Sequence, residues 1–216
     1  MPDPFGPTQF AAEIAKTSPV SHETLSRLET YVALLTEWNA RQNMVSKSSL
    51  AEVWQRHIWD SAQLAPLLPP EAKTLVDLGS GAGFPALVLG TMRPGLKITL
   101  YESVAKKCRF LAEAAGVLGL DVEIRNARIE DSKLEGFDVL TARALAPLYQ
   151  LLSYAARFQA QNTVNLLLKG QDIEVELKDT TKSWRMQITR HASQTGPGTI
   201  LEIRKLRHVQ SGRPLV

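Results

Sequence analysis

The sequence predicts an α/β fold, a mostly parallel seven-stranded sheet with helices on both faces. Three observations predict it. From Thr74 onward, short apolar runs alternate with helical patterns, which is typical of strand–helix–strand units. A glycine-rich loop at 79–83 follows the first of these runs. The last two extended runs, 183–191 and 200–205, are joined by a Gly-Pro-Gly turn, which predicts a closing antiparallel hairpin.

The first 70 residues are predicted to form a helical extension. Ser21 is a favourable N-cap, and apolar residues follow it at helical spacing, from Leu25 to Leu35. A second helical pattern runs from about Leu50 to Leu68 and stops at two prolines. We therefore divide the chain into an N-terminal helical extension, 1–70, and an α/β domain, 71–216.

The elements of the α/β domain follow from periodicity and from glycine and proline breaks. The expected parallel strands are 74–78, 97–102, 121–125, 137–141 and 163–169. The expected helices run from near Pro85 to Met92, over 104–118, from Pro147 onward and over 171–179.

Composition limits the class of protein. The chain has 216 residues, 44% of them hydrophobic, which is enough to bury a substantial core. A single cysteine, Cys108, excludes an intrachain disulfide framework and a multi-cysteine metal site. There is no signal-peptide pattern and no bilayer-length apolar run. We expect a cytoplasmic monomer with no metal and no membrane segment.

Charge is distributed unevenly along the chain. Residues 1–72 carry 5 Lys/Arg and 8 Asp/Glu, whereas residues 73–216 carry 20 and 14. The half that holds the glycine loop is therefore basic, which favours a polyanionic substrate. An ordinary solvated surface is the alternative explanation.

The glycine loop indicates a nucleotide site. Gly79, Gly81 and Gly83 follow Asp77 at the end of the first strand. Glycine lets a backbone turn sharply and approach a ligand closely. The spacing is not that of a dinucleotide fingerprint, because Phe84 stands where its third glycine would be. The Gly-Lys-Ser/Thr ending of a phosphate loop is absent as well.

An acidic residue, Glu102, ends the second strand and suits the two hydroxyls of a ribose. Asp-x-Gly-x-Gly-x-Gly with this later acid resembles the S-adenosylmethionine site of Rossmann-like class I methyltransferases. Two alternatives remain open: a tight strand–helix turn beside a solvated Glu102, and a dinucleotide site.

Further motifs resemble one family, ribosomal RNA small-subunit methyltransferase G, also called glucose-inhibited division protein B. In chain order they are Trp38-Asn39 with Asn43, Arg56-His57-Ile58-x-Asp60-Ser61, Asp77 to Pro85, Glu102-Ser103 with Lys106-Lys107, Phe110-Leu111, Arg128-x-Glu130, Phe137-Asp138, Thr141-x-Arg143-Ala144 and Lys169-Gly170. Two departures are Ala86, where the family has glycine, and Met44-Val45, where it has Leu-Thr. The resemblance implies methyl transfer from S-adenosylmethionine to N7 of a guanine in 16S ribosomal RNA, free or in the small ribosomal subunit.

The resemblance also implies site residues. The cofactor-binding candidates are Asp77, Gly79, Ser80, Gly81, Gly83, Phe84, Glu102, Ile129, Glu130 and Arg143. Backbone near Gly79 is expected at the methionine part, Glu102 at the ribose, and Ile129 and Glu130 around the adenine. Arg143 is expected at the reaction mouth and is the one candidate catalytic residue. A structural salt bridge is the alternative role for Arg143.

The predicted chemistry needs no general base, because guanine N7 has a free lone pair and no proton to lose. His57 and Asp60, three residues apart, could form an acid–base pair, but we favour a role in packing the extension or shaping the RNA entrance. The candidates for phosphate contacts are Lys106, Lys107, Arg109, Arg204, Lys205, Arg207 and Arg213.

Three rival functions remain at this stage. The first is a methyltransferase that acts on a different RNA, a protein or a small molecule. The second is a binding module that keeps the fold without catalysis, against which the intact loop, Glu102, Glu130 and Arg143 argue. The third is an NAD-dependent oxidoreductase, which the glycine spacing disfavours.

Overall fold

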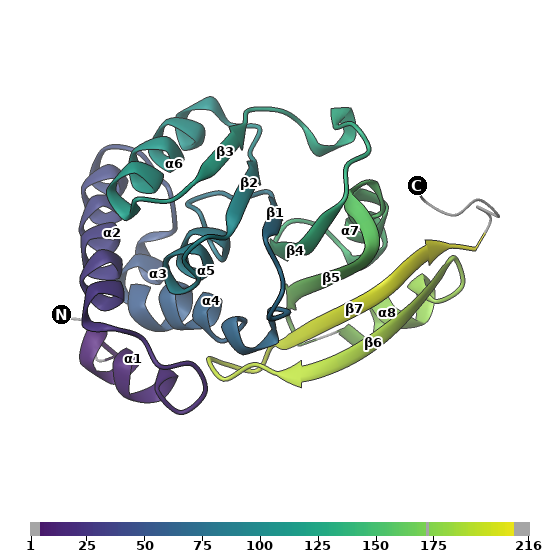
Figure 1. The fold of residues 1–216 in the computed structure, drawn as a ribbon, viewed down its shortest axis with the longest axis horizontal. Coiled ribbons are helices and arrows are strands. Elements are labelled where there is room, and N and C mark those ends of the chain that lie inside the picture. The colour runs from purple at the N-terminus through teal and green to yellow at the C-terminus, as the bar shows by residue number, and fades with distance from the viewer. Residues whose placement is uncertain (1–4, 172, 210–216) are drawn as a thin grey trace.

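One seven-stranded sheet forms the centre of the computed structural model, which describes residues 5–171 and 173–209. The strand order is β3-β2-β1-β4-β5-β7-β6 (Figure 1). The strands are β1 (Thr74–Leu78), β2 (Lys97–Tyr101), β3 (Val122–Arg125), β4 (Phe137–Arg143), β5 (Gln159–Lys169), β6 (Trp184–Ala192) and β7 (Thr199–His208). Strands β1 to β5 pair in parallel, and β7 is antiparallel to both β5 and β6. The predicted mostly parallel sheet with a closing hairpin is confirmed.

Helices cover both faces of this sheet, as the sequence predicts. They include α5 (Ala86–Met92), α6 (Ala105–Leu118), α7 (Leu148–Ala155) and α8 (Ile173–Thr180). Because strand side chains alternate between faces, neighbours on β1 join different cores. Leu75 belongs to the core that contains α5 and α6, whereas Val76 belongs to the core that contains α7 and α8.

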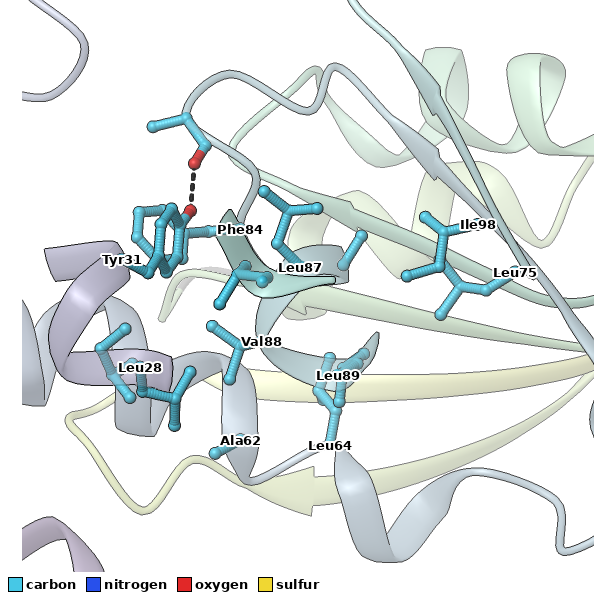
Figure 2. Packing of buried hydrophobic residues seen from close by; sticks show 14 of the residues in the cluster. Leu28, Tyr31, Ala62, Leu64, Leu75, Phe84, Leu87, Val88, Leu89 and Ile98 are labelled. Atoms are coloured by element: carbon cyan, nitrogen blue, oxygen red, sulfur yellow. Dashed lines mark hydrogen bonds between the residues drawn. The ribbon is translucent and has the colours of Figure 1, made fainter. Parts of the chain in front are cut away.

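The N-terminal helices α1 (Pro7–Ile14) and α2 (His22–Arg41) pack on the α5–α6 side. The predicted cap is confirmed, because the Ser21 hydroxyl accepts the backbone N–H of Thr24 at 3.0 Å. Figure 2 shows Leu28 and Tyr31 of α2 lying beside Phe84 and the first turn of α5. Each such buried side chain stabilises the fold by about 1.5–3 kcal/mol. Among the described residues no helix, α2 included, is long and apolar enough to cross a bilayer.

The single helix predicted over Leu50–Leu68 is wrong. The structure has α3 (Lys47–Ala51), a π-helical segment (Trp54–Trp59), α4 (Asp60–Ala62) and a 3₁₀ turn (Ala65–Leu67) instead. Long-range contacts give the reason. Arg143, far along the chain, donates to the backbone carbonyl of Arg56 at 2.9 Å. A side chain inserted into a helical hydrogen-bond ladder in this way favours a wider turn.

The N-terminal helices and the α/β part share one hydrophobic core, which runs from Phe10 to Ile200. The boundary at residue 70 stays a prediction. For function, the important consequence is that the segment 54–62 is held against the glycine loop. Ala62 and Phe84 belong to the same buried cluster.

Candidate active site

The glycine loop connects β1 to α5 at the point where the strand order reverses, between β1 and β4. Open parallel sheets bind ligands outside the carboxyl ends of their strands at such a point. The φ angles of Gly79, Gly81 and Gly83 are +69°, +58° and +91°. A Cβ on Gly79 would lie 2.5 Å from Leu145 Cδ1. The loop therefore requires glycine both for its backbone conformation and for space.

Glu102 stands directly after β2, beside this loop. Its carboxylate accepts the Gly81 N–H at 2.9 Å and the Val104 N–H at 2.8 Å. The side chain is buried, with 6% exposed. A carboxylate has about four lone-pair sites, so each oxygen keeps acceptor capacity for a ligand hydroxyl. Glu102 thus fixes the loop and remains able to bind a diol.

Asp77 lies behind the loop in the sheet. Thr141 of β4 donates to its Oδ1 at 2.6 Å, whereas its Oδ2 is buried and has no hydrogen-bond partner among the described residues. Burial raises the pKa of Asp77 to about 7, with the Thr141 hydrogen bond and the Arg143 charge opposing that shift. An unpartnered buried carboxylate oxygen favours a cationic or donor group nearby.

Two cavities adjoin the loop and share Gly79, Ala144 and Leu145. The larger, about 650 Å³, is lined by four more of the predicted site residues: Ser80, Gly81, Phe84 and Arg143. The smaller, about 390 Å³, is lined by Glu102, Ile129 and Glu130 and also by Lys107. Asp77 and Gly83 line neither cavity, because Asp77 lies in the sheet and Gly83 packs under Tyr31 and Leu87.

Arg143 ends β4 and joins the extension to the site. Its Nη1 donates to Asp60 Oδ2 at 3.2 Å and to the carbonyl of Arg56, and its Nη2 donates to His57 Nδ1 at 2.8 Å. Its guanidinium carbon lies 5.2 Å from the centre of the Phe84 ring. Arg143 therefore lines the larger cavity and also forms the salt bridge that was the alternative, while its role in the reaction stays a prediction.

His57 and Asp60 do not contact each other as an acid–base pair, because Arg143 lies between them. The His57 ring stacks on Phe84 with centroids 4.7 Å apart. Since a guanidinium only donates, His57 Nδ1 is an acceptor and the ring proton is on Nε2. Burial, together with Arg143 and Arg56, lowers the pKa of His57 to about 3. The ring is neutral and serves as packing for Phe84 and as an acceptor for Arg143.

Several residues at this site were missed by the sequence analysis. Tyr31 donates to the Ala82 carbonyl in the glycine loop (Figure 2). Thr195, in the turn of the β6–β7 hairpin, donates to Asp60 Oδ1 at 2.8 Å. Lys169 at the end of β5 forms an ion pair with Glu176 at 2.9 Å. Only Lys169 had a signal, as part of a quoted motif, because the other contacts join segments far apart in sequence.

The phosphate-contact candidates lie in two places. Lys106, Lys107 and Arg109 are on α6, and Lys107 lines the smaller cavity. Arg204, Lys205 and Arg207 are on β7, and Arg213 lies outside the described residues.

The two cavities fit S-adenosylmethionine in donor set and arrangement. Glu102 offers carboxylate lone pairs for ribose hydroxyls, and Ile129 and Glu130 line the same cavity. At Gly81 an added Cβ would meet only the Gly79 carbonyl, at 3.9 Å, so the loop leaves open space there. Asp77 is buried behind the loop, lines neither cavity and has its pKa raised to about 7, so its contact with the cofactor stays a prediction.

Two solved structures share the fold. The AdoMet complex of M. jannaschii TYW2 has a TM-score of 0.58 at 13% identity, covering 79% of this chain and 80% of that one. The mitomycin 7-O-methyltransferase MmcR has a TM-score of 0.57 at 18% identity, covering 94% and 73%. At these identities the likeness concerns the fold alone. Fold and site together define a class I S-adenosylmethionine-dependent methyltransferase.

Sequence comparison identifies the family. The family model described as rRNA small subunit methyltransferase G matches residues 24–200. This chain belongs to that family. A relative named ribosomal RNA small subunit methyltransferase G, from Bradyrhizobium sp. (strain ORS 278), is 47% identical over 192 residues, 86% of each chain. One of the same name from Paramagnetospirillum magneticum is 45% identical over 201 residues, 93% of this chain and 97% of its own.

Proposed function

We propose that this enzyme methylates N7 of a guanine in 16S ribosomal RNA. The family and the names of its relatives support ribosomal RNA of the small subunit as the substrate. The observation that carries the proposal is the larger cavity, which combines the glycine loop with an arginine. The candidate bases among its described lining residues, His57 and Asp60, are both hydrogen-bonded to that arginine. N7 of guanine is an acceptor at an exposed edge, so it attacks without losing a proton.

S-adenosylmethionine, when bound, supplies a methyl group on a sulfonium sulfur, which is a good leaving group. The residues of this chain contribute position rather than proton transfer. Glu102 would hold the ribose, the backbone at Gly79 to Gly81 would hold the methionine part, and Phe84 would limit the space beside it. Alignment of two reactants can replace a large part of an activation barrier.

The charged groups near the cavity support a mechanism without a base. Asp60 is held by Arg143, Thr195 and Gln63. The low pKa of His57, about 3, and its bond from Arg143 keep its ring neutral and engaged. Neither side chain is placed to accept a proton from a substrate.

Arg143 is proposed to contact the guanine O6 or an adjoining phosphate. Its contacts in the protein use three of the five guanidinium N–H groups, which leaves two as donors. A guanidinium recognises the O6 edge of guanine well. The three fixed contacts orient the plane of the group, so less conformational freedom is lost on binding.

The cellular setting of this reaction is part of the proposal. The RNA is free or in the small ribosomal subunit, and the enzyme acts in the cytoplasm as a monomer. These statements rest on the family description and on the expectations from composition.

The test is methyl transfer from labelled S-adenosylmethionine to small ribosomal subunits that lack the modification, with the modified nucleotide mapped. We expect label on N7 of one guanine of 16S RNA. Cofactor binding without label on RNA would overturn the proposed substrate and favour another acceptor.

A further inference from the structure

Positively charged side chains cluster at the end of the β6–β7 hairpin opposite its turn. β6 is the edge strand of the sheet (Figure 1). In the antiparallel register Arg185 of β6 lies directly opposite Arg207 of β7. Like charges directly opposite each other destabilise a strand pair. An anion between them would remove this repulsion.

A β-bulge next to this pair adds a third cation. The register shifts between Arg185 and Gln187, so that Lys205 and Leu206 oppose the single residue Met186. Lys205 has a φ of +53°, in the left-handed region. Bulges of this kind favour glycine at that position, whereas this chain has lysine. The bulge places an ammonium group beside the two guanidinium groups, although the backbone there favours another residue.

These three cations have no carboxylate partner among the described residues, although neighbouring arginines on the same strands do. Arg185 donates to the backbone carbonyl of Thr181 at 3.3 Å, which leaves its charge uncompensated. Arg204 pairs with Glu202 at 2.7 Å, and Arg190 pairs with Glu174. Arg185, Lys205 and Arg207 are exposed and line a concave surface of about 430 Å³. We call this surface the hairpin groove; its lining residues are Arg185, Met186, Gln187, Lys205, Arg207, His208 and Val209.

We propose that the hairpin groove binds the sugar–phosphate backbone of the RNA substrate, at a distance from the methylated base. The inference rests on the proposed function for the choice of RNA as the polyanion. Unpaired arginine and lysine side chains in a groove are the usual contacts for phosphate oxygens. A phosphate seated between Arg185 and Arg207 offsets the repulsion that the free protein retains.

A substrate that reaches both the hairpin groove and the larger cavity must be a polymer. The turn of the same hairpin, at Ser193 and Thr195, lines the larger cavity. Ala192 lies seven positions after Arg185 on the extended strand, a span of about 23 Å at 3.3 Å per residue. A single nucleotide cannot reach both places, whereas a folded RNA can. The hairpin thus connects the site of chemistry to a second anchoring point.

The test compares RNA binding by R185Q/R207Q with that of the matched control R27Q/R41Q. The control also removes two arginines, each paired with a glutamate one turn away on α2. Affinity for unmodified 16S RNA is measured as a function of salt. We expect R185Q/R207Q to weaken binding by roughly tenfold and to lower the log–log salt slope by about 1.4 to 1.8. Unchanged binding, or equal losses in the two variants, would overturn the proposal.

A charge reversal gives a second readout that a structural role would not produce. R207E places a carboxylate opposite Arg185, so we expect a higher melting temperature together with weaker RNA binding. A lower melting temperature with normal RNA binding would contradict the proposal. Methyl transfer to RNA by the unaltered enzyme is measured in the same experiment. Absence of this transfer would refute the proposed function. Normal transfer together with normal RNA binding by the variants would refute only the role of the hairpin groove.

Discussion

The arginine side chains near the two ends of the β6–β7 hairpin differ in their partners. At the turn, Arg143 is held by Asp60, His57 and a backbone carbonyl, and Asp60 in turn accepts a hydrogen bond from Thr195. At the other end, Arg185 and Arg207 face each other without a carboxylate among the described residues, and Arg185 donates only to the Thr181 carbonyl, at 3.3 Å. An arginine with three protein acceptors is fixed in direction, whereas one without a carboxylate partner keeps donors for a ligand. The first arrangement suits chemistry and the second suits anchoring.

The largest effect is expected from R143A, which removes the fixed arginine. We expect turnover to fall by about 10²-fold, because misplacement of a reactant by about 1 Å has that effect. The free energy of unfolding should fall by about 1–3 kcal/mol, because the buried His57 Nδ1 and the Arg56 carbonyl lose this donor, whereas Asp60 keeps donors from Gln63 and Thr195. Single-turnover transfer and chemical denaturation measure the two quantities. R27Q is the control, because Arg27 on α2 pairs with the exposed Glu23 and lines neither cavity. Unchanged turnover in R143A would show that Arg143 has no role in catalysis.

E102Q tests the predicted contact between Glu102 and the ribose of the cofactor. The carboxylate accepts two backbone N–H groups, and an amide can replace only one oxygen as an acceptor. We expect S-adenosylmethionine to bind about 10- to 100-fold more weakly, from a loss of about 1.5–3 kcal/mol in charged hydrogen bonds. Calorimetric titration measures this. E29Q, an exposed change on α2, should have no effect; normal affinity in E102Q would exclude the ribose contact.

D77N tests whether the buried carboxylate carries the raised pKa of about 7. Because the folded chain binds this proton more tightly than the unfolded chain, the free energy of unfolding falls as the pH rises from about 4 to about 7. Asparagine removes this loss while its oxygen can still accept from Thr141. We expect D77N to be more stable than the unaltered protein at pH 8, on the order of 4 kcal/mol. The difference in stability should vanish near pH 4. A difference that does not depend on pH would contradict the raised pKa of Asp77.

K205G should produce the smallest effect and probes the other end of the hairpin. Glycine relieves the left-handed backbone at a gain of about 1–2 kcal/mol, offset by about 0.4–1 kcal/mol of unfolded-chain entropy. We expect a net gain of about 0.5 kcal/mol in stability and a salt slope for RNA lower by about 0.7 to 0.9. K205Q is the control, since it removes the charge and keeps the strain. Equal stability of both variants would argue against strain at Lys205.

Local patterns predicted the sheet and most helices because each element carries its own signal. The strand β1 and the start of α5 at Ala86 follow from an apolar run and from glycine and proline positions. The prediction was wrong for the segment Trp54–Trp59, because its apolar periodicity resembles that of an ordinary α-helix. Its wider turn accompanies a hydrogen bond from Arg143, which no local pattern encodes.

The site residues could be predicted where they belong to a recognisable sequence motif. Glu102 and the loop at Gly79 and Gly81 lie together as expected. The contacts of Tyr31 and Thr195 were not predictable, because each joins residues more than 50 positions apart. The pairing of Arg185 with Arg207 depends on strand register, which a bulge shifts.

The most direct measurement is steady-state kinetics of R143A and R185Q/R207Q on the same unmodified small ribosomal subunits. We predict that R143A lowers kcat, whereas R185Q/R207Q raises KM for the subunit and leaves kcat unchanged. Such a split would assign chemistry to one end of the hairpin and anchoring to the other. If both variants changed the same parameter to the same extent, this division of roles would be contradicted.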